Sequence, residues 1–150
     1  MQLKIKKLRE NAVLPKRMTE YSAGYDIAAC LDEPLDIKPG STVKVPTGIA
    51  AELVCDGSYV LLTYARSSLA TKHGLAPANC VGVIDSDYRG EIFIPLHNSS
   101  DKPYTVSDGE RIAQLIVTPV VFPEIVESAE LSDTARGGGG FGSTGISADK

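Results

Sequence analysis

Residues 81–94 concentrate side chains that can act as a base and recognise a ligand. Asp85 and Tyr88 stand in a polar centre, and short apolar runs at 81–84 and 92–94 flank this centre. The pattern predicts a β-hairpin with a polar turn. One interpretation is an ordinary solvated hairpin tip. The other is that two stiff strands hold a carboxylate and a phenol in fixed positions beside a substrate.

A second polar group, Arg66, Ser67 and Ser68, stands directly before a run of helix-forming residues that ends at Gly74. Serine hydroxyls cap helix N-termini and glycine ends helices, so this segment predicts one or two turns of helix. The free amides of that helix, next to an arginine, would bind an anion. The alternative is a capped helix with a surface arginine.

Gln114 lies within an apolar stretch, 112–117, that predicts a buried strand. A buried amide without hydrogen-bond partners costs on the order of 1–3 kcal/mol. Gln114 is therefore either a core amide with partners or a ligand contact, and its apolar neighbours favour the core amide.

The C-terminal part of the chain changes character, with six glycines in the ten residues 136–145. One interpretation is a flexible linker or tail. The other is an arm that closes over a nucleotide, in which Arg136, Ser143 and Thr144 bind phosphate and Phe141 stacks on a base. A Walker-type phosphate loop does not fit, because Ser143 stands where that motif has lysine.

These candidate residues must be positioned by strands, because period-two alternation and turn signals recur along most of the chain. The predicted strands begin near Leu3 and cover Tyr25–Ala28, Thr42–Leu53, Tyr59–Tyr64, Pro103–Val106 and Ile112–Val117. Strands that follow one another without intervening long helices indicate an all-β sandwich or barrel.

Composition excludes several classes of function. A chain of 150 residues suits one domain, and a net charge of −4 argues against binding along nucleic acid. The three cysteines, Cys30, Cys55 and Cys80, form no Cys-x-x-Cys pair and accompany only two histidines, so we do not expect zinc. We expect the thiols to be small buried hydrophobes in a reducing environment.

The sequence contains neither a secretory signal pattern nor an apolar run long enough to span a membrane. We therefore expect an intracellular, cytoplasmic protein that does not contact membranes.

Five segments, in order, resemble the five motifs of the trimeric dUTP diphosphatases (dUTPases). They are Ala23–Ile27, Ala65–Ala70, Asn79–Glu91, Gly109–Gln114 and Arg136–Gly145. Together they extend over nearly the whole chain. The resemblance implies a jelly-roll-like β-barrel or sandwich with one short helix, comprising residues 1–131. It also implies a homotrimer with shared active sites, in which the glycine-rich arm, residues 132–150, closes over a neighbouring subunit's site.

The implied reaction is hydrolysis of dUTP to dUMP and pyrophosphate by attack of water at the α-phosphate. It would limit uracil incorporation into DNA and supply dUMP for dTMP synthesis. By similarity, Asp85 would orient and deprotonate the water, and Tyr88 would pack against the deoxyribose where a ribose 2′-hydroxyl would clash. Asn79 and neighbouring residues, including Val83, would read the uracil edge.

The remaining implied roles concern the phosphates and a metal ion. Arg66, Ser67, Ser68 and Gln114 would hold phosphates, while Arg136, Phe141, Gly142, Ser143 and Thr144 would close the lid. Magnesium would be bound by the three phosphates, with Asp26 contacting it through a water. We assign Asp87 and Arg89 to turn structure and ion pairing, although two carboxylates this close could also form a metal pair.

Ser68 departs from the family pattern, since many relatives have glycine there, and we expect little effect. Two alternatives remain. One is an enzyme similar to the dCTP deaminases, which would lack this aspartate–tyrosine segment. The other is a catalytically inactive relative that binds or regulates, against which the presence of Asp85, Tyr88, Arg136 and Phe141 argues.

Overall fold

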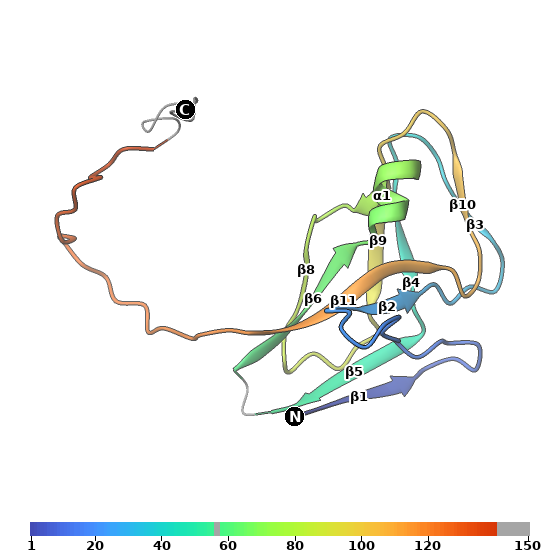
Figure 1. Ribbon diagram of the computed structural model, residues 1–150, viewed down its shortest axis with the longest axis horizontal. Helices are drawn as coiled ribbons and strands as arrows, with labels where there is room; N and C mark the ends of the chain where they lie inside the picture. Colours follow the sequence, from blue (N-terminus) through green and yellow to red (C-terminus); the bar gives the residue numbers. More distant parts are fainter. Residues whose placement is uncertain (56–57, 141–150) are drawn as a thin grey trace.

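The computed structural model describes residues 1–55 and 58–140, which form mainly β-strands with one short helix (Figure 1). The strands are β1 (Gln2–Lys7), β2 (Tyr25–Ala28), β3 (Leu35–Ile37), β4 (Thr42–Pro46), β5 (Ile49–Val54), β6 (Tyr59–Ala65), β7 (Leu75–Pro77), β8 (Gly82–Ile84), β9 (Phe93–Asn98), β10 (Tyr104–Val106) and β11 (Arg111–Pro119). The helix α1 spans Ser67–His73. The predicted all-β class and short helix are confirmed.

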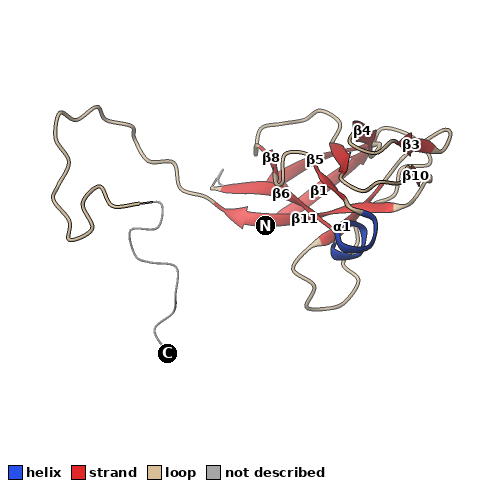
Figure 2. Cartoon of the chain, turned by 90° about the horizontal axis from the view of Figure 1, so that it is seen from above, coloured by secondary structure: helices blue, strands red, loops and turns tan. Residues whose placement is uncertain are grey.

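Four small sheets make up the domain. The largest has the order β2-β11-β6-β8, the second has the order β4-β9-β7, and two pairs, β1-β5 and β10-β3, complete the set. All pairings are antiparallel. Figure 2 shows the strands gathered into one body with α1 at its edge.

A single main core fills the space between these sheets. Alternate residues of the central strand β9, Ile94 and Leu96, are fully buried, and Leu115 of β11 joins them. The alternation is the expected consequence of the period-two geometry of strands. Asn98 is a buried polar residue in β9, and its amide donates to the carbonyl oxygens of Ile37 and Lys102 at 2.9 and 2.8 Å.

Two strand predictions are wrong in a way that matters for the site. The predicted strand Thr42–Leu53 is broken into β4 and β5 at Thr47 and Gly48. Gly48 has a φ of +65°, and an added Cβ would lie 2.6 Å from the sulfur of Cys30, so only glycine fits this corner. The predicted hairpin over residues 81–94 is also absent, because β8 pairs with β6, whereas β9 pairs with β4 and β7.

Beyond β11 the chain leaves the domain and runs outward (Figures 1 and 2). Its apolar side chains are exposed there, with Val121 at 87% and Ile125 at 96%. A turn from Thr134 to Gly139 is held by contacts within the segment, including a 2.9 Å bond from Arg136 Nε to the carbonyl oxygen of Gly139.

Candidate active site

The loop from Asp85 to Ile92 joins two strands that belong to different sheets, β8 and β9. Because these two strands diverge, a hollow of about 240 Å³ opens between them. Its lining comes from β8, β9, the loop between them and β4, and consists of Lys44, Val83, Ile84, Asp85, Tyr88, Glu91, Ile92 and Phe93. A closed hairpin would have filled this space with cross-strand contacts.

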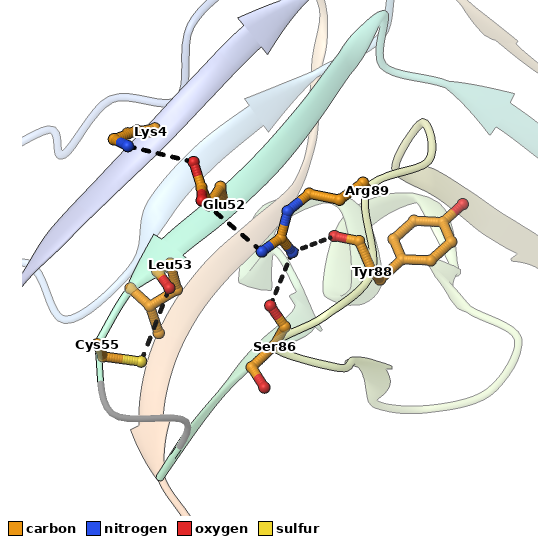
Figure 3. A network of polar contacts seen from close by, with 7 residues as sticks. All are labelled: Lys4, Glu52, Leu53, Cys55, Ser86, Tyr88 and Arg89. Atoms are coloured by element: carbon orange, nitrogen blue, oxygen red, sulfur yellow. Dashed lines mark hydrogen bonds and ion pairs between the residues drawn. The ribbon is translucent and has the colours of Figure 1, made fainter.

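Arg89 fixes the loop against the neighbouring sheet (Figure 3). Its Nη1 donates to the carbonyl oxygens of Ser86 and Tyr88 at 2.8 and 3.0 Å. Its Nη2 lies 3.8 Å from Glu52 Oε1 on β5, and the same carboxylate lies 3.3 Å from Lys4 Nζ on β1. The structural role predicted for Arg89 is therefore confirmed.

The C-terminal end of this loop is hydrogen-bonded to the corner between β4 and β5. Thr47, which is fully buried, donates through its hydroxyl to the carbonyl oxygen of Ile92 at 2.5 Å. The amide of Gly48 donates to Glu91 Oε1 at 2.9 Å. These contacts were not predicted from the sequence, because residues 47–48 reach residues 91–92 only once β4 pairs with β9, about 45 residues away in sequence.

Tyr88 lies across Gly90, with its hydroxyl donating to the carbonyl oxygen of Glu91 at 2.9 Å. A Cβ added at Gly90 would lie 2.6 Å from the ring carbon Cζ of Tyr88. Gly90 therefore provides the space that the ring occupies. Tyr88 as a whole remains 46% exposed, so it is available to a ligand.

Asp85 is exposed and lines two hollows, the one between β8 and β9 and a larger one of about 640 Å³. The larger hollow lies along β6, β8 and the chain beyond β11, and Asp87 also lines it. The main-chain oxygen of Asp85 accepts a bond from the amide of Tyr88 at 3.1 Å, which fixes the turn between these residues. A fixed backbone thus presents the Asp85 carboxylate to solvent.

A second group of predicted site residues meets where β2, β11 and the start of α1 come together. Asp26 Oδ2 lies 2.9 Å from Arg111 Nη1 and 3.4 Å from Arg66 Nε. Gln114 stands opposite Asp26 in the sheet, and its Nε2 donates to the carbonyl oxygen of Ala65 at 2.9 Å. This bond agrees with the interpretation of Gln114 as an amide with a partner.

The start of α1 differs from the prediction in one respect. Arg66 occupies the N-cap position without a side-chain capping bond, so the predicted serine cap is wrong. Ser67 and Ser68 lie in the first turn and are exposed. The helix end is as predicted, because Gly74 adopts the left-handed conformation with a φ of 67°.

Tyr104 and Glu110 hold the turn that leads into β11. The Tyr104 hydroxyl donates to Glu110 Oε1 at 2.6 Å, and the amide of Ser107 donates to the other carboxylate oxygen at 3.0 Å. Burial, together with the bond to Glu110, raises the pKa of Tyr104 to about 12. The phenol therefore remains a hydrogen-bond donor at neutral pH.

The cysteines do not behave alike. Cys30 is fully buried, its thiol donates to Asn11 Oδ1 at 3.1 Å, and burial raises its pKa. Cys55 is half-buried and Cys80 is exposed, so the prediction of buried thiols is confirmed for Cys30 and wrong for Cys80. The described residues contain no group of three or more metal-ligating His, Cys, Asp or Glu side chains.

The two groups of site residues lie well apart within the chain. Ile84, next to Asp85, pairs with Leu61 near the start of β6, whereas Arg66 follows the end of that strand. Five residues of strand separate the two places by about 16 Å. Val83 belongs to the Asp85 group as an exposed residue of β8, and Asn79 lies in the turn before that strand.

Arg136 is the one predicted lid residue within the described part of the chain, and it lies apart from both groups. Arg136 is exposed on the segment beyond β11. Phe141, Gly142, Ser143 and Thr144, which the sequence assigned to the lid, lie outside the described residues.

No helix in the described ranges is long and apolar enough to cross a bilayer.

Comparisons with known proteins agree on one family. The dUTPase family model matches residues 10–145. The deoxyuridine 5'-triphosphate nucleotidohydrolase of Desulfitobacterium hafniense is 52% identical over 134 residues, which cover 89% of this chain and 88% of that protein. That of Neisseria meningitidis serogroup A is 44% identical and covers 97% of both chains.

Solved structures give the same result. The dUTPase of Staphylococcus bacteriophage 80alpha, solved with dUpNHpp, superposes with a TM-score of 0.86 at 30% identity and covers 97% of this chain and 99% of its own. A mutant dUTPase of phage phi11 of S. aureus, described with a structural Mg(II) ion, has a TM-score of 0.79 at 25% identity and covers 89% and 100%. From the sequence match, the fold and the arrangement of its motifs, this chain belongs to the dUTPase family.

Proposed function

We propose that this protein hydrolyses dUTP to dUMP and pyrophosphate. The observation that carries the proposal is the rigid loop that presents the Asp85 carboxylate beside a hollow lined by Tyr88. The Asp85 carboxylate accepts a proton from a water molecule, whose oxygen forms a bond to the α-phosphorus. The bond from that phosphorus to the bridging oxygen breaks, and pyrophosphate leaves. Such a reaction needs positioning and charge neutralisation more than a protein nucleophile.

The hollow between β8 and β9 is suited to the uracil base. β8 is the last strand of its sheet, so the backbone groups on its outer edge can donate to and accept from a ligand. Backbone groups at fixed positions can distinguish the acceptor–donor–acceptor edge of uracil from that of cytosine. Asn79, in the turn before this strand, would add a side-chain amide, and Val83 an apolar contact.

The triphosphate would be held by the second group of site residues. The side chain of Arg66 is 21% exposed, and Ser67 and Ser68 are exposed residues that add hydroxyls at the start of α1. Gln114 stands beside them on β11. The arm, with Arg136, Phe141, Gly142, Ser143 and Thr144, would close over the bound nucleotide.

A homotrimer would unite these groups. Within one protomer the Asp85 loop and Arg66 are about 16 Å apart along β6, too far to enclose one nucleotide tightly. A neighbouring copy can supply the missing half of the site, and the outward course of residues 120–140 suits the arm to reach another subunit.

Magnesium fits this site as an ion carried by the substrate. The described residues offer no cluster of three acidic or histidine ligands, so the phosphates must supply most ligands. Asp26 uses Oδ2 for both arginine contacts, which leaves Oδ1 as an acceptor for a metal-bound water. When bound, the ion neutralises charge on the phosphates.

Pyrophosphate release from four nucleotides, with magnesium present, tests the proposal. We expect rapid release from dUTP and far slower release from dTTP, dCTP or UTP. Deamination of dCTP would instead indicate a deaminase-like enzyme. Binding of dUTP without turnover would indicate an inactive relative, and either result would overturn the proposal.

Replacing Gly90 by alanine should weaken the discrimination between dUTP and UTP. The new methyl group would collide with the Tyr88 ring, whose Cζ lies 2.6 Å from the added Cβ, and would move the ring away from the sugar. We expect kcat/KM for dUTP to fall about tenfold, with a smaller loss for UTP. Steady-state kinetics with both nucleotides measures this, with Gly40→Asn as the control, because an added Cβ there meets nothing within 4 Å and asparagine tolerates the left-handed φ of +69°. Unchanged discrimination would remove Tyr88 from sugar recognition.

A further inference from the structure

Asp26, Arg66 and Arg111 form a charge cluster in which the carboxylate of Asp26 contacts both guanidinium groups. Asp26 Oδ2 lies 2.9 Å from Arg111 Nη1 and 3.4 Å from Arg66 Nε, and Arg66 Nη1 donates to the carbonyl oxygen of Arg111 at 2.9 Å. The Asp26 side chain is only 15% exposed, so the pairing is shielded from solvent. We infer that Arg111 is a positioning residue, which shares Asp26 so that Arg66 keeps its orientation and its charge for a substrate phosphate. The inference rests on the proposed function.

The backbone of β11 brings Arg111 to this place. Three positions separate Arg111 from Gln114, and in a regular strand such residues point to opposite faces. The register between β11 and β2 shifts between Arg111 and Ala113, which is a β-bulge. A bulge redirects a side chain and places the Arg111 guanidinium on the Asp26 carboxylate, 85 residues away in sequence.

The charge of the cluster explains why a second arginine is useful. A pair of Asp26 and Arg66 alone would be neutral, and its guanidinium would have little attraction left for a triphosphate. With Arg111 the same three side chains carry a net charge of +1, because two cations share one anion. Within the described residues Arg66 uses Nε and Nη1 for these contacts, which leaves Nη2 for a phosphate oxygen.

The variant Arg111→Gln should raise KM for dUTP about tenfold and leave kcat within about threefold, because charge attraction acts alike on the bound substrate and the transition state. Affinity for dUpNHpp should fall by a similar factor. Arg111→Lys, which keeps the charge, should restore KM to within about threefold of wild type. The control is Arg9→Gln, since Arg9 is an exposed arginine that donates to the carbonyl oxygen of Cys30 and does not contact Asp26.

A double-mutant cycle with Asp26→Asn tests whether Arg111 acts through Asp26. If it does, Arg111→Gln raises KM by less than about threefold in the Asp26→Asn background. An equal loss in both backgrounds, or an unchanged KM in Arg111→Gln alone, would overturn the inference. Thermal unfolding of each variant verifies that the domain is folded. A wild-type protein that does not hydrolyse dUTP would refute the proposed function instead, whatever the variants do.

Discussion

Replacing Asp85 by asparagine should lower kcat for dUTP by about 10²–10⁴-fold, which is the usual contribution of a general base. Asparagine has the same shape and can still contact a water molecule, but it cannot accept the proton. The surrounding loop should keep its structure, because its contacts come from Arg89, Tyr88 and the main chain. Quench-flow or steady-state release of pyrophosphate measures the rate, and calorimetric titration with dUpNHpp should give an affinity within about threefold of wild type.

Asp87→Asn is the matched control for this experiment. Asp87 lies two residues away, is also exposed and lines the larger hollow together with Asp85. Because it does not line the hollow that contains Tyr88, we expect near wild-type turnover. An equal loss in both variants would favour a metal pair of the two carboxylates. A rate near wild type in Asp85→Asn would exclude Asp85 as the base.

The strands that the sequence predicts well are those whose pattern is local. Alternation at Leu3 and Ile5 and the apolar run 112–117 correspond to β1 and β11, which pair with β5 and with β2 and β6. Burial of one face of a strand gives alternating apolar residues, and burial of both faces gives a continuous apolar run. Two strands of three residues, β3 and β7, were not predicted, whereas the equally short β8 and β10 were.

The loop between β8 and β9 shows what such patterns cannot give. Two apolar runs around a polar centre are compatible both with a hairpin and with two strands that enter different sheets. The outcome is decided by pairing with β6 and β4, which lie far away in sequence. This divergence creates the hollow beside Asp85, so the feature on which the proposed base recognition depends is a tertiary one.

The chemical types in the site were easier to predict than their contacts. Asp26, Arg66 and Gln114 could each be selected from the sequence, but their meeting depends on the register of β2, β11 and β6. Arg111 stood inside a recognised motif without an assigned role, and only the bulge in β11 reveals its contact with Asp26. The predicted serine cap is wrong as well, and the residue at the N-cap position, Arg66, has its side chain held by Asp26 and the carbonyl oxygen of Arg111.

Ending the chain at Ala135 should reduce kcat/KM for dUTP by at least about 10²-fold without unfolding the domain. The shortened chain lacks Arg136 and the hydroxyls and ring that we expect to cover the phosphates and base, and removing fixed donors of this kind has effects of that size. The domain should tolerate the loss, because the described contacts of Arg136 and Gly139 lie within the Thr134–Gly139 turn and do not involve the sheets. Activity and the unfolding temperature are measured on the same preparations.

A chain that ends at Gly145 is the control for this truncation. It removes five residues, 146–150, but keeps the whole segment from Arg136 to Gly145, so its activity should match that of the full chain. Mixing the Ala135 truncation with an Asp85→Asn full-length chain extends the test to the proposed trimer. Since each of these chains lacks a different part of the site, mixed trimers should recover activity that neither has alone if arms reach neighbouring subunits. Unfolding of the Ala135 truncation would make the arm structural, and full activity of that chain would exclude it from the site.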